Sequence, residues 1–191
     1  MKRPVLKIQY DSPVILTFVL LSLAALILND ATNGYTNTAI FSVYRSSLTD
    51  PLTYVRMIFH VLGHADFSHF VSNVCLILVI GPIVERFYGS VNVLISILIT
   101  ALVSGLVHFI FFPGSALLGA SGIVFMLIFL SSVSGFKKGT VPISLILVAI
   151  LYLGQEIYAL ITLKDNISQL THIIGGVCGI VCGVSLSGRR R

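Results

Sequence analysis

Residues 119–135 read GASGIVFMLIFLSSVSG, a short apolar run between two glycine-containing segments. The run carries no charged residue, and it predicts a helix over residues 121–134. A helix of that length rises by about 21 Å, which is less than the roughly 30 Å hydrocarbon core of a bilayer. In a membrane, Ser121 would therefore begin its helix below the surface, where irregular backbone must line a protein or water cavity.

The composition distinguishes a membrane protein from a soluble one. The 191 residues are 56% hydrophobic and 10% charged, and the mean hydropathy is +1.01. An ordinary soluble domain has about 25% charged residues. So few polar residues cannot cover the outside of a soluble fold of this size. We therefore expect an all-α membrane protein in which residues 1–191 form a single domain.

The net charge of +5 lies at the ends of the apolar runs, which indicates membrane orientation and not a nucleic-acid partner. We predict a bundle of six transmembrane helices over residues 13–28, 70–87, 91–112, 121–134, 141–161 and 171–186. Most basic residues then fall on one face, namely Lys2, Arg3, Lys7, Arg86, Lys137, Lys138, Arg189, Arg190 and Arg191. By the positive-inside rule, both termini are expected to be cytoplasmic.

The connection between the first two predicted helices, residues 29–69, is long and mixes apolar side chains with arginines and histidines. A long loop with amphipathic content usually packs and often serves function. We expect this loop to lie at the membrane interface and to be partly helical.

Polar side chains at membrane depth are costly and tend to be functional. In the six-helix topology, the second, fourth and sixth helices all begin on the outer side of the membrane. Near their starts lie His69 and Asn73, then Ser121, then His172. Three segments that are distant in the sequence thus bring polar groups to one depth.

Ser121 and His172 suit a nucleophile and its base, because a serine hydroxyl is weak until a neutral histidine accepts its proton. Gly175, Gly179 and Gly183 follow His172 at helical spacing, and small residues at that spacing let another helix approach closely. Each residue also has a simpler explanation. Serine is common at helix N-caps, so one alternative is that Ser121 only caps its helix. The corresponding alternative for His172 is that it only caps a packed helix.

His69 and Asn73 are four residues apart and therefore share one face of a helix. Both donate hydrogen bonds, which suits an oxyanion hole completed by the N–H of Ser121. The alternative is that the pair ties the long loop to its helix. His60 and His64, with His69, also suggest a metal, but no nearby carboxylate or thiolate completes a site with convincing spacing, so we do not expect a metal there.

Other polar residues are assigned structural roles or none. We expect the Glu85–Arg86 pair to make an ion pair or a backbone contact, and His108 to be a satisfied core or interface residue. Gln155 and Glu156 lie near the outer end of the fifth predicted helix, where they are either interfacial or border a substrate entrance.

Four short motifs resemble those of the rhomboid intramembrane proteases. They are GxSG at residues 119–122, HxxxN at 69–73, ExxxG at 85–89 and HxxGxxxG at 172–179. Their order, spacing and topology agree with the family from about residue 56 to residue 183. The chain looks like the minimal bacterial six-helix form, which implies a multi-pass protein of the bacterial plasma membrane.

The resemblance implies a Ser–His dyad of Ser121 and His172, with His69 and Asn73 holding the oxyanion. It also implies cleavage of transmembrane protein substrates in the bilayer, near its outer face, without a metal or cofactor. The alternative is a rhomboid-like pseudoprotease, catalytically weak, that binds membrane helices without cutting them. A small transporter or channel is disfavoured, because the sequence lacks an inverted repeat and paired interrupted helices. Oligomeric state and natural substrate are not predicted.

Two residues depart from the family pattern. Val55 stands before Arg56 where a tryptophan is frequent, and Phe125 stands four residues after Ser121 where a tyrosine is frequent. A phenylalanine can still stack on His172. Gly119 and Gly122 are expected to shape the loop around the nucleophile, as Gly175 and Gly179 shape the helix contact.

Overall fold

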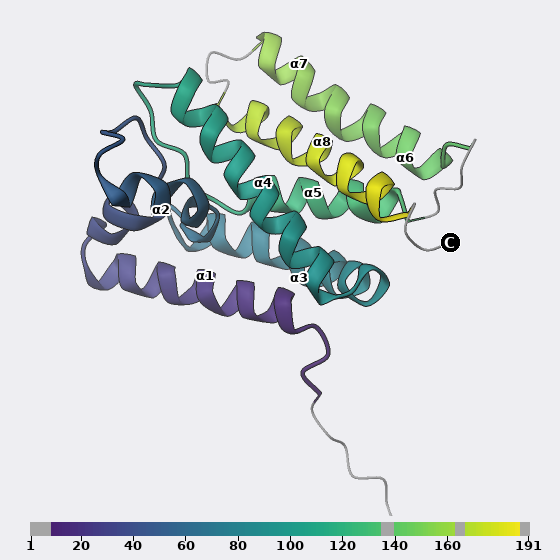
Figure 1. Ribbon diagram of the computed structural model, residues 1–191, viewed down its shortest axis with the longest axis horizontal. Coiled ribbons are helices and arrows are strands. Elements are labelled where there is room, and N and C mark those ends of the chain that lie inside the picture. The colour runs from purple at the N-terminus through teal and green to yellow at the C-terminus, as the bar shows by residue number, and fades with distance from the viewer. Residues whose placement is uncertain (1–8, 135–139, 163–166, 188–191) are drawn as a thin grey trace, which may run out of the picture.

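The computed structural model describes residues 9–134, 140–162 and 167–187, which form a bundle of helices without a β-strand (Figure 1). The helices are α1 (Pro13–Ala31), the π-helical turn η1 (Asn37–Phe41), α2 (Pro51–Phe59), the 3-10 turn η2 (His60–Leu62), α3 (Phe67–Tyr88), α4 (Ser90–Phe111), α5 (Ser121–Ser132), α6 (Ile143–Val148), the π-helical turn η3 (Ala149–Leu153), α7 (Gly154–Thr162) and α8 (Ile167–Ser187). Among the described residues, α1, α3, α4 and α8 are long and apolar enough to cross a membrane, and two further apolar helices are shorter.

All six predicted segments fall on helical parts of the chain, and they differ from the observed helices at their ends and, in the fifth segment, within it. α3 begins at Phe67 because Asp66 caps it, its carboxylate accepting the N–H of His69 at 2.8 Å. α8 begins four residues before the predicted start, so His172 lies in its second turn and not at its first residue. The fifth predicted helix is divided into α6, η3 and α7.

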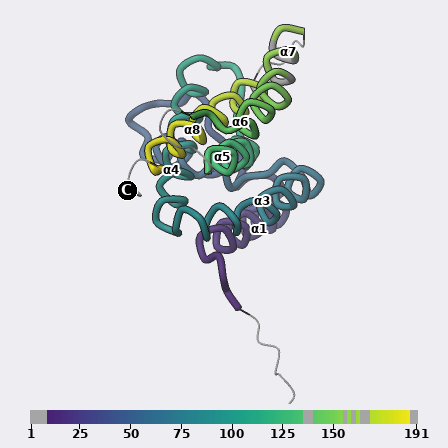
Figure 2. Tube along the Cα trace, turned by 90° about the vertical axis from the view of Figure 1, so that its right-hand side faces the viewer, coloured from purple at the N-terminus to yellow at the C-terminus, as the bar shows by residue number. Residues whose placement is uncertain are grey.

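α5 lies at the centre of the bundle, with α3, α4, α6 and α8 around it (Figure 2). It has 12 residues, and every residue from Gly122 to Leu130 is buried. A helix of that length is about 18 Å long. Protein surrounds it, so its irregular flanks need not face hydrocarbon, which agrees with the expectation for a short helix at this position.

Glycines bring α8 against α5, as their spacing predicted. A methyl group on Gly175 would collide with the backbone of Gly122, and one on Gly179 with the backbone of Met126. Gly183 continues the same face one turn further on. No other pair of elements packs as extensively among the described residues as α5 and α8. We call this contact the α5–α8 seam.

The long connection between α1 and α3 is partly helical, as predicted, and packs on α4. The guanidinium of Arg45 donates to the carbonyl of Phe109 at 3.1 Å. Arg56 is buried, bonds the carboxylate of Asp50 at 2.7 Å and lies over the ring of Tyr44 at 4.8 Å. The arginine therefore anchors the loop without the tryptophan that Val55 replaces.

Glu85 joins α3 to the start of α1, in the structural role that the sequence predicted. Its carboxylate accepts the N–H groups of Val14 at 3.0 Å and Ile15 at 2.9 Å. These belong to the first turn of α1, whose N–H groups have no partner within the helix and favour negative charge. Arg86 pairs with Asp11 at 3.3 Å on the surface.

The outer faces of the bundle are apolar. On α3, α4 and α6 respectively, Val79, Phe111 and Ile143 are 68%, 68% and 73% exposed. Soluble proteins rarely expose apolar surface on this scale, whereas a surface in contact with lipid requires it. The peripheral helices α6 and α7 run along one edge, outside α8 (Figure 1).

Candidate active site

Ser121 is the first residue of α5 and is half-buried. Ala120 is the N-cap, and the helix has no side-chain cap, so Ser121 does not serve as the N-cap residue that we considered as an alternative. The first N–H groups of a helix have no acceptor within it and carry partial positive charge. Ser121 therefore presents its hydroxyl beside backbone donors.

The segment before Ser121 is fastened to the long loop by backbone hydrogen bonds. Val43 and Leu117 exchange two of them, each 2.9 Å long, in an isolated antiparallel bridge. The N–H of Gly119 donates to the carbonyl of His60 at 2.9 Å. These bonds set the position of the chain as it enters α5.

Gly119 occupies a place that only glycine fits. Its φ is +127°, a conformation that other residues rarely adopt. A methyl group there would also lie 2.8 Å from Cε1 and 2.9 Å from Nε2 of His69. The imidazole of His69 therefore lies directly against the loop that leads into Ser121.

His172 stacks on Phe125, as expected of a phenylalanine at that position. The two rings lie 4.3 Å apart at an interplanar angle of 6°. Tyr152, on η3, meets Phe125 edge-on at 5.9 Å and 86°. A row of aromatic contacts, one edge-on and one stacked, thus runs from the peripheral helix through α5 to the imidazole on α8.

Asn73 is buried one turn after His69 on α3. Its amide donates one hydrogen bond to the carbonyl of His69 at 3.0 Å. A primary amide has two N–H donors, so a second one remains for another acceptor.

These side chains meet in one cavity of about 350 Å³. It is lined by His69, Ser72, Asn73, Leu76, Leu117, Leu118, Ser121, Val124, Phe125, Ser168 and His172. The structure therefore brings the four predicted polar residues together from three helices. Gly119, Gly122, Gly175 and Gly179 do not line the cavity but let the surrounding segments approach.

Sequence reasoning missed several residues of the lining. Ser168 lies one turn before His172, and helical spacing alone would have found it once α8 was known to start at Ile167. Leu117 and Leu118 come from the irregular segment before α5, whose path no periodicity predicts.

The remaining histidines contact protein groups. His60 is buried with its Nε2 3.1 Å from the carbonyl of Ala101, and His64 lies within the loop with its Nδ1 3.1 Å from the carbonyl of Leu62. Burial lowers the pKa of both to about 4.

His108 contacts the carbonyl of Ser115 at 3.1 Å, in agreement with a structural role. Within the described residues, no group of three or more histidine, cysteine or acidic side chains is arranged to hold a metal. The side chains of Gln155 and Glu156 lie outside the described part of the structure.

The fold and the cavity define a multi-pass helical membrane protein with serine, histidine and asparagine side chains gathered at one site. The family model of the rhomboid domain matches residues 51–189, which is more than half of the chain. The chain belongs to the rhomboid family.

Two relatives carry the same family name. The chain is 28% identical over 159 residues to rhomboid-related protein 2 of Mus musculus, covering 73% of this chain and 53% of that protein. It is 27% identical over 168 residues to rhomboid protease GluP of Bacillus subtilis (strain 168), covering 83% of this chain and 32% of that protein. The chain thus spans about half the length of the first relative and about a third of the second.

Proposed function

We propose that this protein is an intramembrane serine endopeptidase that cleaves transmembrane substrates with a dyad of Ser121 and His172. The observation that carries the proposal is the shared cavity, which brings Ser121 on α5, His172 on α8 and two hydrogen-bond donors on α3 to one place. The membership of the rhomboid family and the protease activity stated in the name of the Bacillus relative support the same reaction.

The dyad acts by ordinary acid–base steps. His172 accepts the proton of the Ser121 hydroxyl as its oxygen attacks a peptide carbonyl. The same imidazole then protonates the leaving amine, and water hydrolyses the acyl-enzyme. Stacking on Phe125 restricts the rotation of the imidazole, which keeps it in one orientation for both transfers.

The oxyanion is held by the N–H of Ser121, by His69 and by the second amide N–H of Asn73. Donors at a helix N-terminus and on a packed helix need no reorganisation when charge develops. The contact between Gly119 and the His69 ring supports this role, because it keeps the imidazole beside the nucleophile.

The six apolar helical segments cross the membrane, with both termini in the cytoplasm, in a bacterial plasma membrane. The cavity then opens toward the outer face, and the irregular loop from α1 to α3 lies at the interface. Water reaches Ser121 from that side. A substrate helix enters laterally and unwinds locally, because a regular helix shields its carbonyls; glycine, serine or alanine near the cleaved bond makes the unwinding easier.

The test is cleavage of a transmembrane substrate by purified protein in liposomes. Ser121→Ala and His172→Ala are expected to lower kcat by about a thousandfold or more, because each removes one half of the dyad. The matched control is Ser132→Ala at the other end of α5, where the hydroxyl only bonds the carbonyl of Ile128 at 2.8 Å. Retained activity in either dyad variant contradicts the mechanism.

The alternative, a pseudoprotease that binds membrane helices without cutting them, makes a different prediction. A fluorophosphonate labels a serine only when a base activates it. Labelling of the wild-type protein at Ser121, and its absence in His172→Ala, supports the protease. An unlabelled wild-type protein that still binds a transmembrane peptide supports the pseudoprotease.

A further inference from the structure

His64 lies behind the candidate active site and has no part in the mechanism proposed above. It follows η2 in the loop between α1 and α3, and none of its surface is exposed. Its ring centroid lies 5.1 Å from that of His69, and the two ring planes meet at 69°. His69 lines the active-site cavity, whereas His64 does not. His64 therefore contacts a proposed oxyanion donor from outside the cavity.

The imidazole of His69 is not fixed by hydrogen bonds. Among the described residues, the hydrogen bonds of His69 are made by its backbone, whose N–H donates to Asp66 and whose carbonyl accepts from Ser72 and Asn73. Rotation of a histidine ring about its last side-chain bond is soft, because that torsion has broad minima. The direction in which the ring N–H points is therefore set by the groups that pack against the ring.

Two contacts restrict the rotation of this ring. At Gly119 the backbone comes so close that an added methyl group would lie 2.8 Å from Cε1 and 2.9 Å from Nε2 of His69. The distance to Nδ1 would be 4.0 Å, so the edge with Cε1 and Nε2 faces the segment that leads into Ser121. The ring of His64 is the second contact. Gly119 and His64 together leave the imidazole little freedom to turn.

His64 is itself firmly placed. Its Nδ1 lies 3.1 Å from the carbonyl of Leu62, and a carbonyl only accepts hydrogen bonds, so this nitrogen carries the proton. Phe70 meets the same ring nearly at right angles, with centroids 5.4 Å apart. The backbone carbonyl of His64 accepts the side-chain N–H of Asn37 at 2.9 Å. A buried ring with these three contacts is a rigid support for its neighbour.

The support is also uncharged near neutral pH. Burial lowers the pKa of His64 to about 4. The ring therefore holds its neighbour without bringing a positive charge toward the active-site cavity, where His172 must take up a proton during the reaction.

We propose that His64 is a positioning residue that holds the imidazole of His69 toward the oxyanion. This inference rests on the proposed protease function, in which His69 donates to the oxyanion. His64 does not line the cavity, so it acts on the oxyanion only through His69. The oxyanion forms only along the reaction, so loss of the support lowers kcat and leaves KM nearly unchanged.

Two substitutions separate the ring of His64 from its hydrogen bond. His64→Phe keeps a ring beside His69 but loses the N–H that the carbonyl of Leu62 accepts. His64→Asn keeps an amide N–H for that carbonyl but loses the ring. In the liposome cleavage assay, at a temperature where both variants are folded, the asparagine variant should lose about tenfold in kcat, as the loss of one aromatic contact implies. The phenylalanine variant should lose less than about threefold.

The opposite order of kcat, or kcat values that simply follow the melting temperatures, would show that His64 serves stability alone. Either result overturns the proposal.

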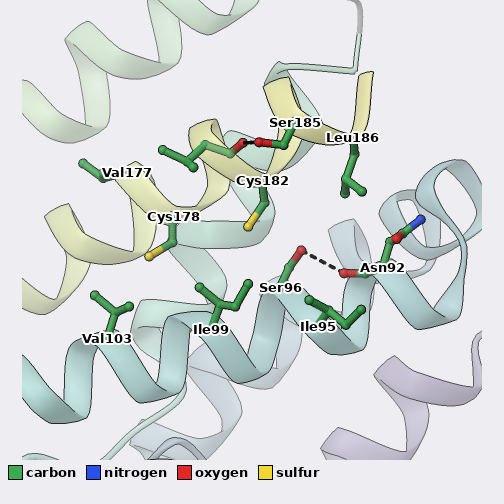
Figure 3. Close-up of a pocket in the computed structure, with 11 residues that line it drawn as sticks. Asn92, Ile95, Ser96, Ile99, Val103, Val177, Cys178, Cys182, Ser185 and Leu186 are labelled. Atoms are coloured by element: carbon green, nitrogen blue, oxygen red, sulfur yellow. Dashed lines mark hydrogen bonds between the residues drawn. The ribbon is translucent and has the colours of Figure 1, made fainter. Parts of the chain in front are cut away.

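The matched control for stability lies in another part of the molecule. An open groove of about 400 Å³ between α4 and α8 shares no lining residue with the active-site cavity (Figure 3). Ser96, which lines the groove, is buried, and its hydroxyl donates to the carbonyl of Asn92 at 2.8 Å. Ser96→Ala removes this hydrogen bond and should lower the melting temperature without changing kcat. A tenfold loss of kcat in this control would mean that lower stability alone explains the effect of His64→Asn, which contradicts the proposal.

Combination with His69→Ala tests whether the effect passes through His69. His64→Asn should lower kcat about tenfold in the wild type and should have no further effect once His69 is alanine. An equal loss in both backgrounds rules out a role through His69. Activity retained in Ser121→Ala contradicts the dyad itself, whereas an inactive Ser121→Ala with unchanged kcat in His64→Asn refutes only the role of His64.

Discussion

The α5–α8 seam and the peripheral helix formed by α6, η3 and α7 both contact Phe125 or its neighbours on α5, but they are packed in opposite ways. In α5, nine consecutive residues from Gly122 to Leu130 are buried, whereas α6 and η3 bury none. Glycines hold α8 at backbone contact with α5, whereas Gly154 at the start of α7 has open space around it. The proposed dyad of Ser121 and His172 thus lies on the tightly packed side, and the peripheral helix is the loosely packed side.

The largest expected effect comes from breaking the seam. Gly175→Leu puts a side chain where the backbone of Gly122 lies, and overpacking of this kind costs about 3 kcal/mol or more. We expect the melting temperature in detergent to fall steeply and activity to be lost with it.

The control for the seam is Gly154→Ala on the peripheral helix. Nothing lies within contact distance of the added methyl group, and alanine favours a helix over glycine by about 0.5–1 kcal/mol. Equal melting temperatures for Gly175→Leu and Gly154→Ala would mean that the two sides do not differ in packing.

Acid is expected to lower the stability of the fold through His64, which lies in the loop between α1 and α3. Burial lowers the pKa of His64 to about 4, so the folded protein keeps this residue neutral while the unfolded chain takes up a proton below about pH 6.5. Stability is therefore complete above that pH and falls as the pH drops toward 4, by about 2 kcal/mol at pH 5 for this one residue.

The measurement is the difference in melting temperature between pH 7 and pH 5, for the wild type and for His64→Asn. The variant lacks the titrating group, so its difference should be smaller, even if its stability at pH 7 is lower. An unchanged difference would show that His64 does not carry the acid sensitivity.

A smaller effect is expected where the two sides meet, at Phe125. Phe125→Leu removes the stack on His172, and an aromatic pair is worth about 0.5–1.5 kcal/mol, so kcat should fall by up to about tenfold with little change in KM. Phe125→Tyr keeps the ring and should retain activity. Equal kcat for the leucine and tyrosine variants would contradict a positioning role.

The smallest effect is expected on the loosely packed side. Tyr152 touches Phe125 only edge-on and is 40% exposed, so Tyr152→Ala should lower kcat/KM by about threefold, and Tyr152→Phe should leave it unchanged. A loss as large as that of Phe125→Leu would show that the peripheral helix helps to hold the imidazole.

The sequence by itself determined the class of fold and the short helix that begins at Ser121. Its composition excludes a soluble core, and the apolar run after Ser121 is too short to span a bilayer. The glycine spacing after His172 also predicted the α5–α8 contact, because only small residues allow backbones to approach. These features follow from local patterns, which a sequence displays directly.

Only the tertiary structure decided the bounds of the helices around the site and the backbone hydrogen bonds that hold the segment before Ser121. The apolar pattern predicted neither the start of α8 at Ile167 nor the division of the fifth predicted helix at η3. The bonds from Val43 to Leu117 and from Gly119 to His60 join segments more than 50 residues apart. No periodicity predicts such pairings, because they depend on which backbone groups meet once the helices have packed.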